Sequence, residues 1–144
     1  MKACVLLGHC DCPETVIRDL HDTVKNLILR EGIDVFYVGT HGSFDRFSYG
    51  VLCQLEKKYA IKINVVLAYL KNKEAYYDCK KTIFPNILEK TPPQYAIIKR
   101  NHYMIDNSEC MICYIDNSHS NAYAYAMRAK KKGLKIINLG RYKL

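Results

Sequence analysis

The chain has 144 residues, enough for one domain with a buried core, and no apolar run approaches the roughly 20 residues that would cross a bilayer. The apolar stretch at residues 3–7 is also too short for a secretory signal, so we expect a cytoplasmic protein that does not bind a membrane. The formal net charge is +8, but basic residues are dense only at residues 128–132, at the end of a predicted helix. No nucleic-acid-binding motif accompanies them, so nucleic acid is not an expected partner.

The first half of the chain alternates apolar strands with amphipathic helices. Residues 3–7 form the first predicted strand, and the helix that follows is expected to begin at Pro13 and to end at Gly32. A second strand covers residues 35–38, and apolar residues at helical spacing predict a second helix over residues 44–55. Short apolar runs of this kind are typical of strands buried on both faces of a parallel sheet.

The second half repeats this alternation around a long loop. Residues 63–70 predict a third strand, and residues 71–93 predict an irregular segment, which at this length is usually functional or packed as a lid. The remaining expected elements are a helix over residues 95–107, a strand over residues 111–115, an alanine-rich helix over residues 121–132 and a last strand over residues 135–139.

Five strands alternating with helices predict an α/β fold in one domain spanning residues 1–144. We expect a Rossmann-like, doubly wound sheet of about five mainly parallel strands with helices on both faces. Ligands of such sheets bind beyond the carboxyl ends of the strands. The loops that follow the strands are therefore the expected site of a small molecule.

Polar residues in three loops and on one helix are the candidates for that site. Gly8 and His9 follow the first strand, where glycine lets a ligand approach the backbone and the start of a helix offers free N–H groups to an anion. The other candidate ligand-binding residues are Gly39, Gly42, Ser43 and Asp45, then Arg100 and Asn101, and finally Ser118, Ser120 and Asn121. Each set has a structural alternative: a tight turn for the first loop, helix capping for the other loops, and a surface ion pair for Arg100.

Two familiar kinds of site are not indicated. The first loop contains neither G-x-G-x-x-G nor G-x-x-x-x-G-K-[ST], which argues against a dinucleotide dehydrogenase and a P-loop NTPase, and no cofactor is expected. Cys10, Cys12, Cys110, Cys113 and His9 form an imaginable zinc site. Strand alternation would place Cys110 and Cys113 on opposite faces of the sheet, so we expect no metal and reduced thiols instead.

Several short motifs together resemble a known family. They are G-H-C-D-C-P at residues 8–13, F-Y-V-G-T-H-G-S-F-D at residues 36–45, E-K-T-P-P at residues 89–93, the Arg-Asn pair at residues 100–101, and K-K-G-L-K-I-I-N-L at residues 131–139. This combination resembles the YpsA-like branch of the SLOG superfamily, a Rossmannoid group related to LOG phosphoribohydrolases and DprA-type proteins. The resemblance implies binding of nucleotides or nucleotide-derived ligands by the loops and the Arg-Asn pair named above.

The chain departs from the family pattern at two points. Residues 120–122 are Ser-Asn-Ala where related sequences usually have Gly-Gly-Ala. The added side chains of Ser120 and Asn121 either narrow the loop that would bind phosphate, or replace its backbone contacts with contacts from the hydroxyl and the amide. The LOG enzymes carry a catalytic glutamate in P-G-G-x-G-T-x-x-E, whereas residues 120–127 contain no carboxylate. The resemblance therefore favours a sensor or accessory protein that binds a nucleotide-derived small molecule over an enzyme.

Two alternatives stay open. One is an N-glycosidic enzyme, either a nucleoside monophosphate phosphoribohydrolase or similar to nucleoside deoxyribosyltransferases, with Asp45 or Asp11 as the carboxylate and His9 or His41 carrying the proton. The other is an interaction module without a ligand, since the chain has 12 tyrosines and tyrosine is enriched at interfaces. Because SLOG-like domains often pair, the resemblance also implies a homo-oligomer.

Overall fold

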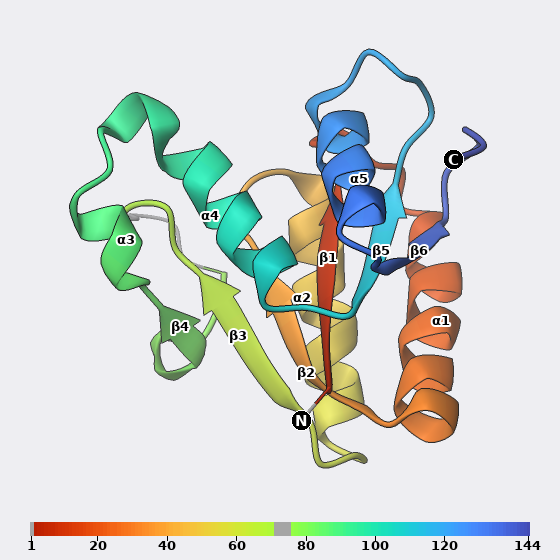
Figure 1. The fold of residues 1–144 in the computed structure, drawn as a ribbon. Coiled ribbons are helices and arrows are strands. Elements are labelled where there is room, and N and C mark those ends of the chain that lie inside the picture. The colour runs from red at the N-terminus through yellow and green to blue at the C-terminus, as the bar shows by residue number, and fades with distance from the viewer. Residues whose placement is uncertain (1, 71–75) are drawn as a thin grey trace.

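One parallel sheet organises the fold, which the computed structural model describes for residues 2–70 and 76–144 (Figure 1). The strands lie in the order β4-β3-β2-β1-β5-β6. They are β1 (Lys2–Gly8), β2 (Ile33–Val38), β3 (Lys62–Val66), β4 (Thr82–Ile83), β5 (Cys110–Tyr114) and β6 (Lys135–Asn138). The chain adds strands first on one side of β1 and then on the other, so the winding reverses between β1 and β5. Ligands of open α/β sheets bind at such a reversal.

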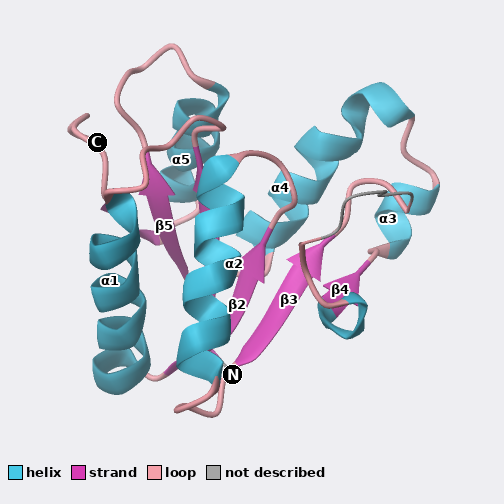
Figure 2. Ribbon diagram, turned by 180° about the vertical axis from the view of Figure 1, so that it is seen from behind, coloured by secondary structure: helices cyan, strands magenta, loops and turns pink. Residues whose placement is uncertain are grey.

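Helices cover both faces of the sheet, which confirms the predicted Rossmann-like α/β fold. The helices α1 (Val16–Glu31) and α2 (Ser43–Glu56) pack on one face, as Figure 2 shows. The helices α4 (Ala96–Asp106) and α5 (Asn121–Lys131) pack on the other face, in front in Figure 1. The shorter helix α3 (Asn86–Glu89) and the 3₁₀ turns η1 (Cys79–Lys81) and η2 (Pro93–Tyr95) belong to the connection from β3 to α4.

Alternation along the strands divides the apolar core into two layers. In β1, Cys4 and Leu6 pack towards α1 and α2, whereas Val5 and Leu7 pack towards α4 and α5. All four side chains are buried because the central strand is covered on both faces. Cys110 and Cys113 of β5 also divide between the two layers, as the alternation predicted.

The first helix begins one turn later than predicted. Pro13 does not open α1. Residues 13–15 instead form a turn in which the N–H of Val16 donates to the carbonyl of Pro13 at 3.1 Å, and the helix starts at Val16. The predicted end is confirmed, because Gly32 adopts a left-handed φ of 68° and caps the helix.

The sheet has a sixth strand that was not expected. The third strand, β3, ends at Val66 rather than at residue 70, because its last partner is Ile83 of the very short β4 and the chain then leaves the sheet. The irregular structure predicted for residues 71–93 is wrong for the described part, residues 76–93, which contains η1, β4, α3 and η2. A strand as short as β4 shows no readable alternation of apolar and polar residues. Residues 71–75 lie outside the described residues.

Candidate functional site

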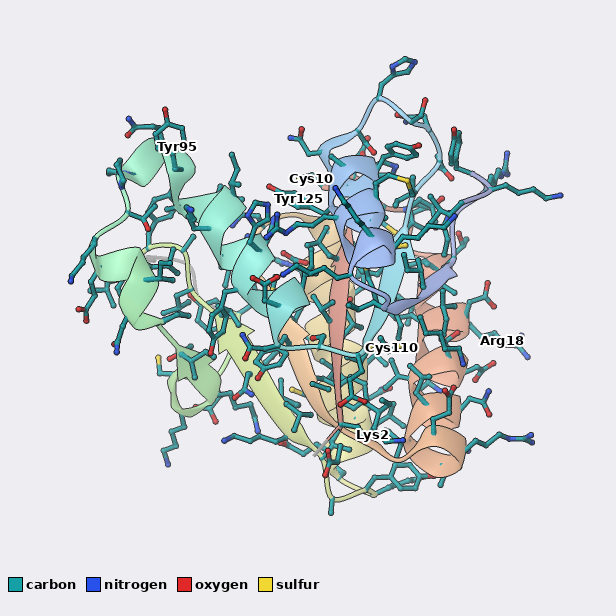
Figure 3. The ribbon with its side chains drawn as sticks, viewed as in Figure 1. Lys2, Cys10, Arg18, Tyr95, Cys110 and Tyr125 are labelled. Atoms are coloured by element: carbon teal, nitrogen blue, oxygen red, sulfur yellow. The ribbon has the colours of Figure 1, made fainter. Side chains whose placement is uncertain are left out.

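A small cavity of about 110 Å³ lies at the carboxyl edge of the sheet, where the winding reverses. Its polar lining consists of Cys10, His41, Asp45, Arg100, Asn101 and Asn121. Its other lining residues are Leu7, Gly8, Ile97, Met104, Ala122 and Tyr125. Cys10 and Tyr125 mark this region in Figure 3. Five residues predicted to bind a ligand therefore line one cavity: Gly8, Asp45, Arg100, Asn101 and Asn121.

Arg100 supplies a buried positive charge to this cavity. It is only 2% exposed. Its Nε donates to Oδ1 of Asn101 at 2.7 Å, its Nη1 donates to the carbonyl of Val66 at 3.2 Å, and its Nη2 lies 3.5 Å from Nδ1 of His41. Among residues 2–70 and 76–144, no carboxylate lies within an ion-pair distance of 4.0 Å of Arg100. Each terminal nitrogen carries two hydrogens, so the guanidinium keeps donors for an anion.

Asp45 supplies a buried carboxyl group to the same cavity. It lies in the first turn of α2, is 6% exposed, and its Oδ2 accepts the backbone N–H of His41 at 2.9 Å. Burial raises the pKa of Asp45 to about 6, against the opposing effects of Arg100 and of the hydrogen bond from His41. A carboxyl group with this pKa gains or loses its proton close to neutral pH, which suits it to proton transfer.

His41 lies at the exposed mouth of the cavity. Partial burial of its ring on the cavity side and the nearby Arg100 lower the pKa of His41, so the imidazole is neutral at pH 7. The ring stands edge-on to Tyr69, with 6.4 Å between the centroids. A neutral imidazole here accepts or donates hydrogen bonds without adding charge beside Arg100.

The start of α5 closes the cavity on the other side. The hydroxyl of Ser120 accepts the N–H of Tyr123 at 3.1 Å and so caps the helix. The N–H groups of Asn121 and Ala122, also in the first turn, have no partner within the helix and carry the positive end of its dipole. The cavity therefore has Arg100 and a helix N-terminus in its wall, an arrangement that favours an anion.

The loops after β1 and β2 are tied to each other beside the cavity. The N–H of Ser43 donates to the carbonyl of Cys10 at 2.7 Å, and its hydroxyl donates to the carbonyls of Cys10 and Cys12 at 2.9 and 3.0 Å. The N-cap position of α2 belongs to Gly42, which has a φ of 90°, so Ser43 joins two loops rather than capping the helix. A Cβ at Gly42 would lie 2.5 Å from the Cα of Cys10, which explains the need for glycine.

Six predicted ligand-binding residues do not line the cavity: His9, Gly39, Gly42, Ser43, Ser118 and Ser120. Nε2 of His9 accepts the N–H of Asp116 at 2.9 Å and so joins the loops after β1 and β5. Gly39 is buried against the side chains of Asp45 and Arg100, whereas Ser118 is exposed. Asp11, the other candidate carboxylate, is also exposed and outside the lining. Contact between these residues and a ligand stays a prediction.

Some lining residues were missed although the sequence carries a signal for them. Ile97 and Met104 bracket Arg100 and Asn101 at spacings of three and four residues, so all four lie on one face of α4. Tyr125 follows Asn121 by one helical turn on α5 in the same way. Cys10 has no such signal, because its place depends on its contacts with Gly42 and Ser43.

Neither a metal site nor a membrane-spanning helix is found among residues 2–70 and 76–144. No group of three or more histidine, cysteine, aspartate or glutamate side chains is arranged there to hold a metal ion. None of the helices described is long and apolar enough to span a membrane.

Comparison with known families now identifies the chain. The model of one family, described as the YspA SLOG family, matches residues 11–138. The chain belongs to the YspA SLOG family. The match runs from Asp11 to the end of β6 and includes the cavity residues of α2, α4 and α5, whereas Leu7, Gly8 and Cys10 precede it. A comparison with curated proteins gives no match.

A solved structure shares the architecture of this SLOG chain. The X-ray structure of DNA processing protein A (DprA) from Streptococcus pneumoniae aligns with a TM-score of 0.67 and 12% sequence identity. The alignment covers 95% of this chain and 50% of that chain, so the SLOG chain spans about half the length of DprA. At this identity the similarity establishes the fold.

Proposed function

We propose that this SLOG protein binds a nucleotide-derived small molecule at the cavity, as a sensor or accessory protein. Arg100 carries the proposal, because its buried guanidinium retains free donors and has no acidic partner within ion-pair distance among the described residues. A buried charge is unfavourable unless an opposite charge or hydrogen bonds compensate it. A phosphate group would supply that compensation, and both arginine and helix N-termini commonly bind phosphate.

The dimensions of the cavity support a ligand that enters it only in part. Its volume of about 110 Å³ is below the roughly 300 Å³ at which pockets for whole drug-sized molecules begin. We assign the phosphate to Arg100 and the first turn of α5, and a ribose hydroxyl to the carboxylate of Asp45. The base would then lie outside, near the exposed His41 and Asn121.

A thermal-shift screen against nucleoside mono-, di- and triphosphates and ADP-ribose tests the proposal. A ligand at a hundred times its dissociation constant stabilises the protein by about 2.7 kcal/mol, which raises the melting temperature by several degrees. We expect a selective shift with one class of nucleotide. No shift with any of these compounds at millimolar concentration would contradict nucleotide binding.

The affinity of variants with substitutions in the cavity then shows whether the ligand binds there. Arg100→Gln removes the buried charge and is expected to weaken binding roughly 10- to 100-fold, the range for hydrogen bonds to charged groups. Asn121→Ala changes an exposed side chain that makes no hydrogen bond with another described residue, so it tests the site without disturbing the fold. The matched control is Asn26→Ala on the exposed face of α1. Equal affinity in Asn121→Ala and Asn26→Ala, together with unchanged binding in Arg100→Gln, would reject this site.

A second candidate function is favoured by Asp45. An N-glycosidic enzyme needs a carboxyl group at the sugar carbon as the bond breaks, and Asp45 lines the cavity with a pKa of about 6. We expect release of free base from a nucleoside monophosphate to be abolished in Asp45→Asn. Asp11→Asn is the matched control, because Asp11 is exposed and outside the cavity. Base release that persists in Asp45→Asn, or is absent from the unmodified protein, would exclude this function.

A further inference from the structure

A second cavity lies far along the α1 and α2 layer from the candidate site. It has a volume of about 260 Å³ and is walled by the middle of α1 and by the C-terminal end of α2 with the turn that follows. Figure 2 shows these two helices side by side on one face of the sheet. Both helices follow a parallel strand and run back along it, so this cavity lies towards the amino edge of the sheet, opposite the cavity of Arg100.

Three lysines line this cavity and give it a positive charge. Lys25 comes from α1, and Lys57 and Lys58 come from the end of α2. The cavity has no acidic residue in its lining, and none of these lysines forms an ion pair with another described residue. Ammonium groups gathered without a counter-ion repel one another, and an anion placed between them relieves that repulsion.

Two acidic residues are next in sequence to lining residues, and each contacts another side chain. Glu56 accepts both of its hydrogen bonds from Nζ of Lys81, at 2.7 Å each, and Oδ1 of Asp22 lies 3.4 Å from Nδ1 of His21. His21 itself lines the cavity. Glu56 is therefore held by Lys81, and Asp22 lies beside the cavity without forming an ion pair with any of the three lysines.

The rest of the wall has groups that suit a compact organic anion. Tyr59 is partly buried and offers an apolar surface, and the buried Leu55 lies at the bottom of the wall with 2% of it exposed. Gln54 offers an amide that donates and accepts hydrogen bonds. Five of the seven lining residues are therefore polar or charged, and Leu55 and Tyr59 form the apolar part. Lysine binds phosphate as a point charge and is common in such sites.

We propose that this cavity is a second binding site, for a small molecule that carries two or more negative charges on phosphate groups. The proposal is independent of the site at Arg100. Three lysines favour a ligand with several negative charges, such as a polyphosphate, over a single carboxylate. Each added negative charge on the ligand is attracted by a further cation of the lining.

Titration of the protein with inorganic pyrophosphate, followed by the shifts of backbone amide NMR signals, tests the site. We expect saturable shifts that concentrate at residues 21–25 and 54–59. The variant Arg100→Gln should show the same shifts, which separates this site from the cavity of the proposed function. Shifts confined to residues 39–45 and 97–101 would assign pyrophosphate to the other cavity and overturn this inference.

A pair of double variants distinguishes binding at this cavity from nonspecific attraction of an anion to a basic protein. Lys57→Ala/Lys58→Ala is expected to weaken pyrophosphate binding about tenfold. Lys130→Ala/Lys131→Ala is the matched control, because these lysines also lie next to each other at the end of a helix, are exposed, and do not line the cavity. The control should bind as tightly as the unmodified protein. An equal loss in both double variants, or no saturable binding at millimolar pyrophosphate, would overturn the proposal.

Discussion

Asp45 and Arg100 both pack against the α-carbon of Gly39. A Cβ added at Gly39 would lie 2.8 Å from Oδ2 of Asp45 and 2.9 Å from Cζ of Arg100, closer than real side chains approach. The carboxyl group comes from the first turn of α2 and the guanidinium from α4, so two distant segments reach the same point at the end of β2. The absence of a side chain at residue 39 is what makes room for both groups.

Gly39→Ala should therefore disturb the site. The added methyl group must displace Asp45 or Arg100, and we expect a loss of about 1–3 kcal/mol in the free energy of unfolding, as for other overpacked positions. Urea denaturation measures this. The control is Gly50→Ala in α2, where nothing lies within 4 Å of the added Cβ. This control should gain about 0.5–1 kcal/mol from helix propensity. Equal stability of the two variants would refute the crowding at Gly39.

The buried carboxyl group of Asp45 predicts a specific pH dependence of stability. Its pKa is raised from 3.8 to about 6 in the folded state, so the folded protein holds this proton more tightly than the unfolded chain. This contribution to stability is fully present below pH 4 and is lost as the pH rises through 6. The shift corresponds to about 3 kcal/mol.

Asp45→Asn removes that titration and keeps an oxygen for the N–H of His41. We expect the variant to be more stable than the unmodified protein at pH 7, by up to about 3 kcal/mol, and the difference to disappear near pH 4. Denaturation curves at several pH values give the answer. The exposed Asp19→Asn makes the same charge change without burial and should alter the profile little. A profile of Asp45→Asn parallel to that of the unmodified protein would contradict the assignment.

Ser120 allows helix capping to be separated from ligand binding. Its hydroxyl caps α5, so Ser120→Ala should cost about 1 kcal/mol of stability, whereas Ser120→Gly should cost only a few tenths. Ser120 is also a predicted ligand contact, so Ser120→Gly should lower the affinity for a nucleotide by more than its small loss of stability explains. Unchanged affinity in Ser120→Gly, measured by calorimetry, would instead limit this hydroxyl to helix capping, in keeping with its place outside the cavity lining.

The cysteines provide a footprint of the cavity. Cys10 and Cys79 are exposed, so a thiol reagent should modify them first. Cys12 is buried, and burial with Asp116 and Asp11 nearby raises its pKa to about 12, so it should react only on unfolding. A nucleotide bound at the candidate site should slow the labelling of Cys10, which lines the cavity, and leave that of Cys79 unchanged. Mass spectrometry of labelled peptides reads both rates, and equal rates with and without the nucleotide would place it elsewhere.

The sequence alone located much of the site, for a reason visible in Asp45 and Asn121. Each lies in the first turn of the helix that follows a strand. Parallel strands bring their carboxyl ends to one edge of the sheet, and only β1 lies between β2 and β5, so the two helix starts lie at the same edge. Arg100 was a candidate phosphate contact from its place on the helix before the fourth predicted strand, with a surface ion pair as the alternative, and the resemblance also placed it in the pocket. The structure excludes that alternative, because the side chain is buried.

The sequence by itself determined the fold class, because the alternation of apolar residues and the turn residues are local properties that can be read without knowing the neighbours. It also determined the end of α1 at Gly32, since a left-handed cap is chosen by the residue that adopts it. Only the tertiary structure decided which polar side chains share the cavity, that Ser43 joins two loops, and that the pKa of Asp45 is raised. Burial and charge at these positions arise from contacts between segments far apart in the chain, and no local pattern records them.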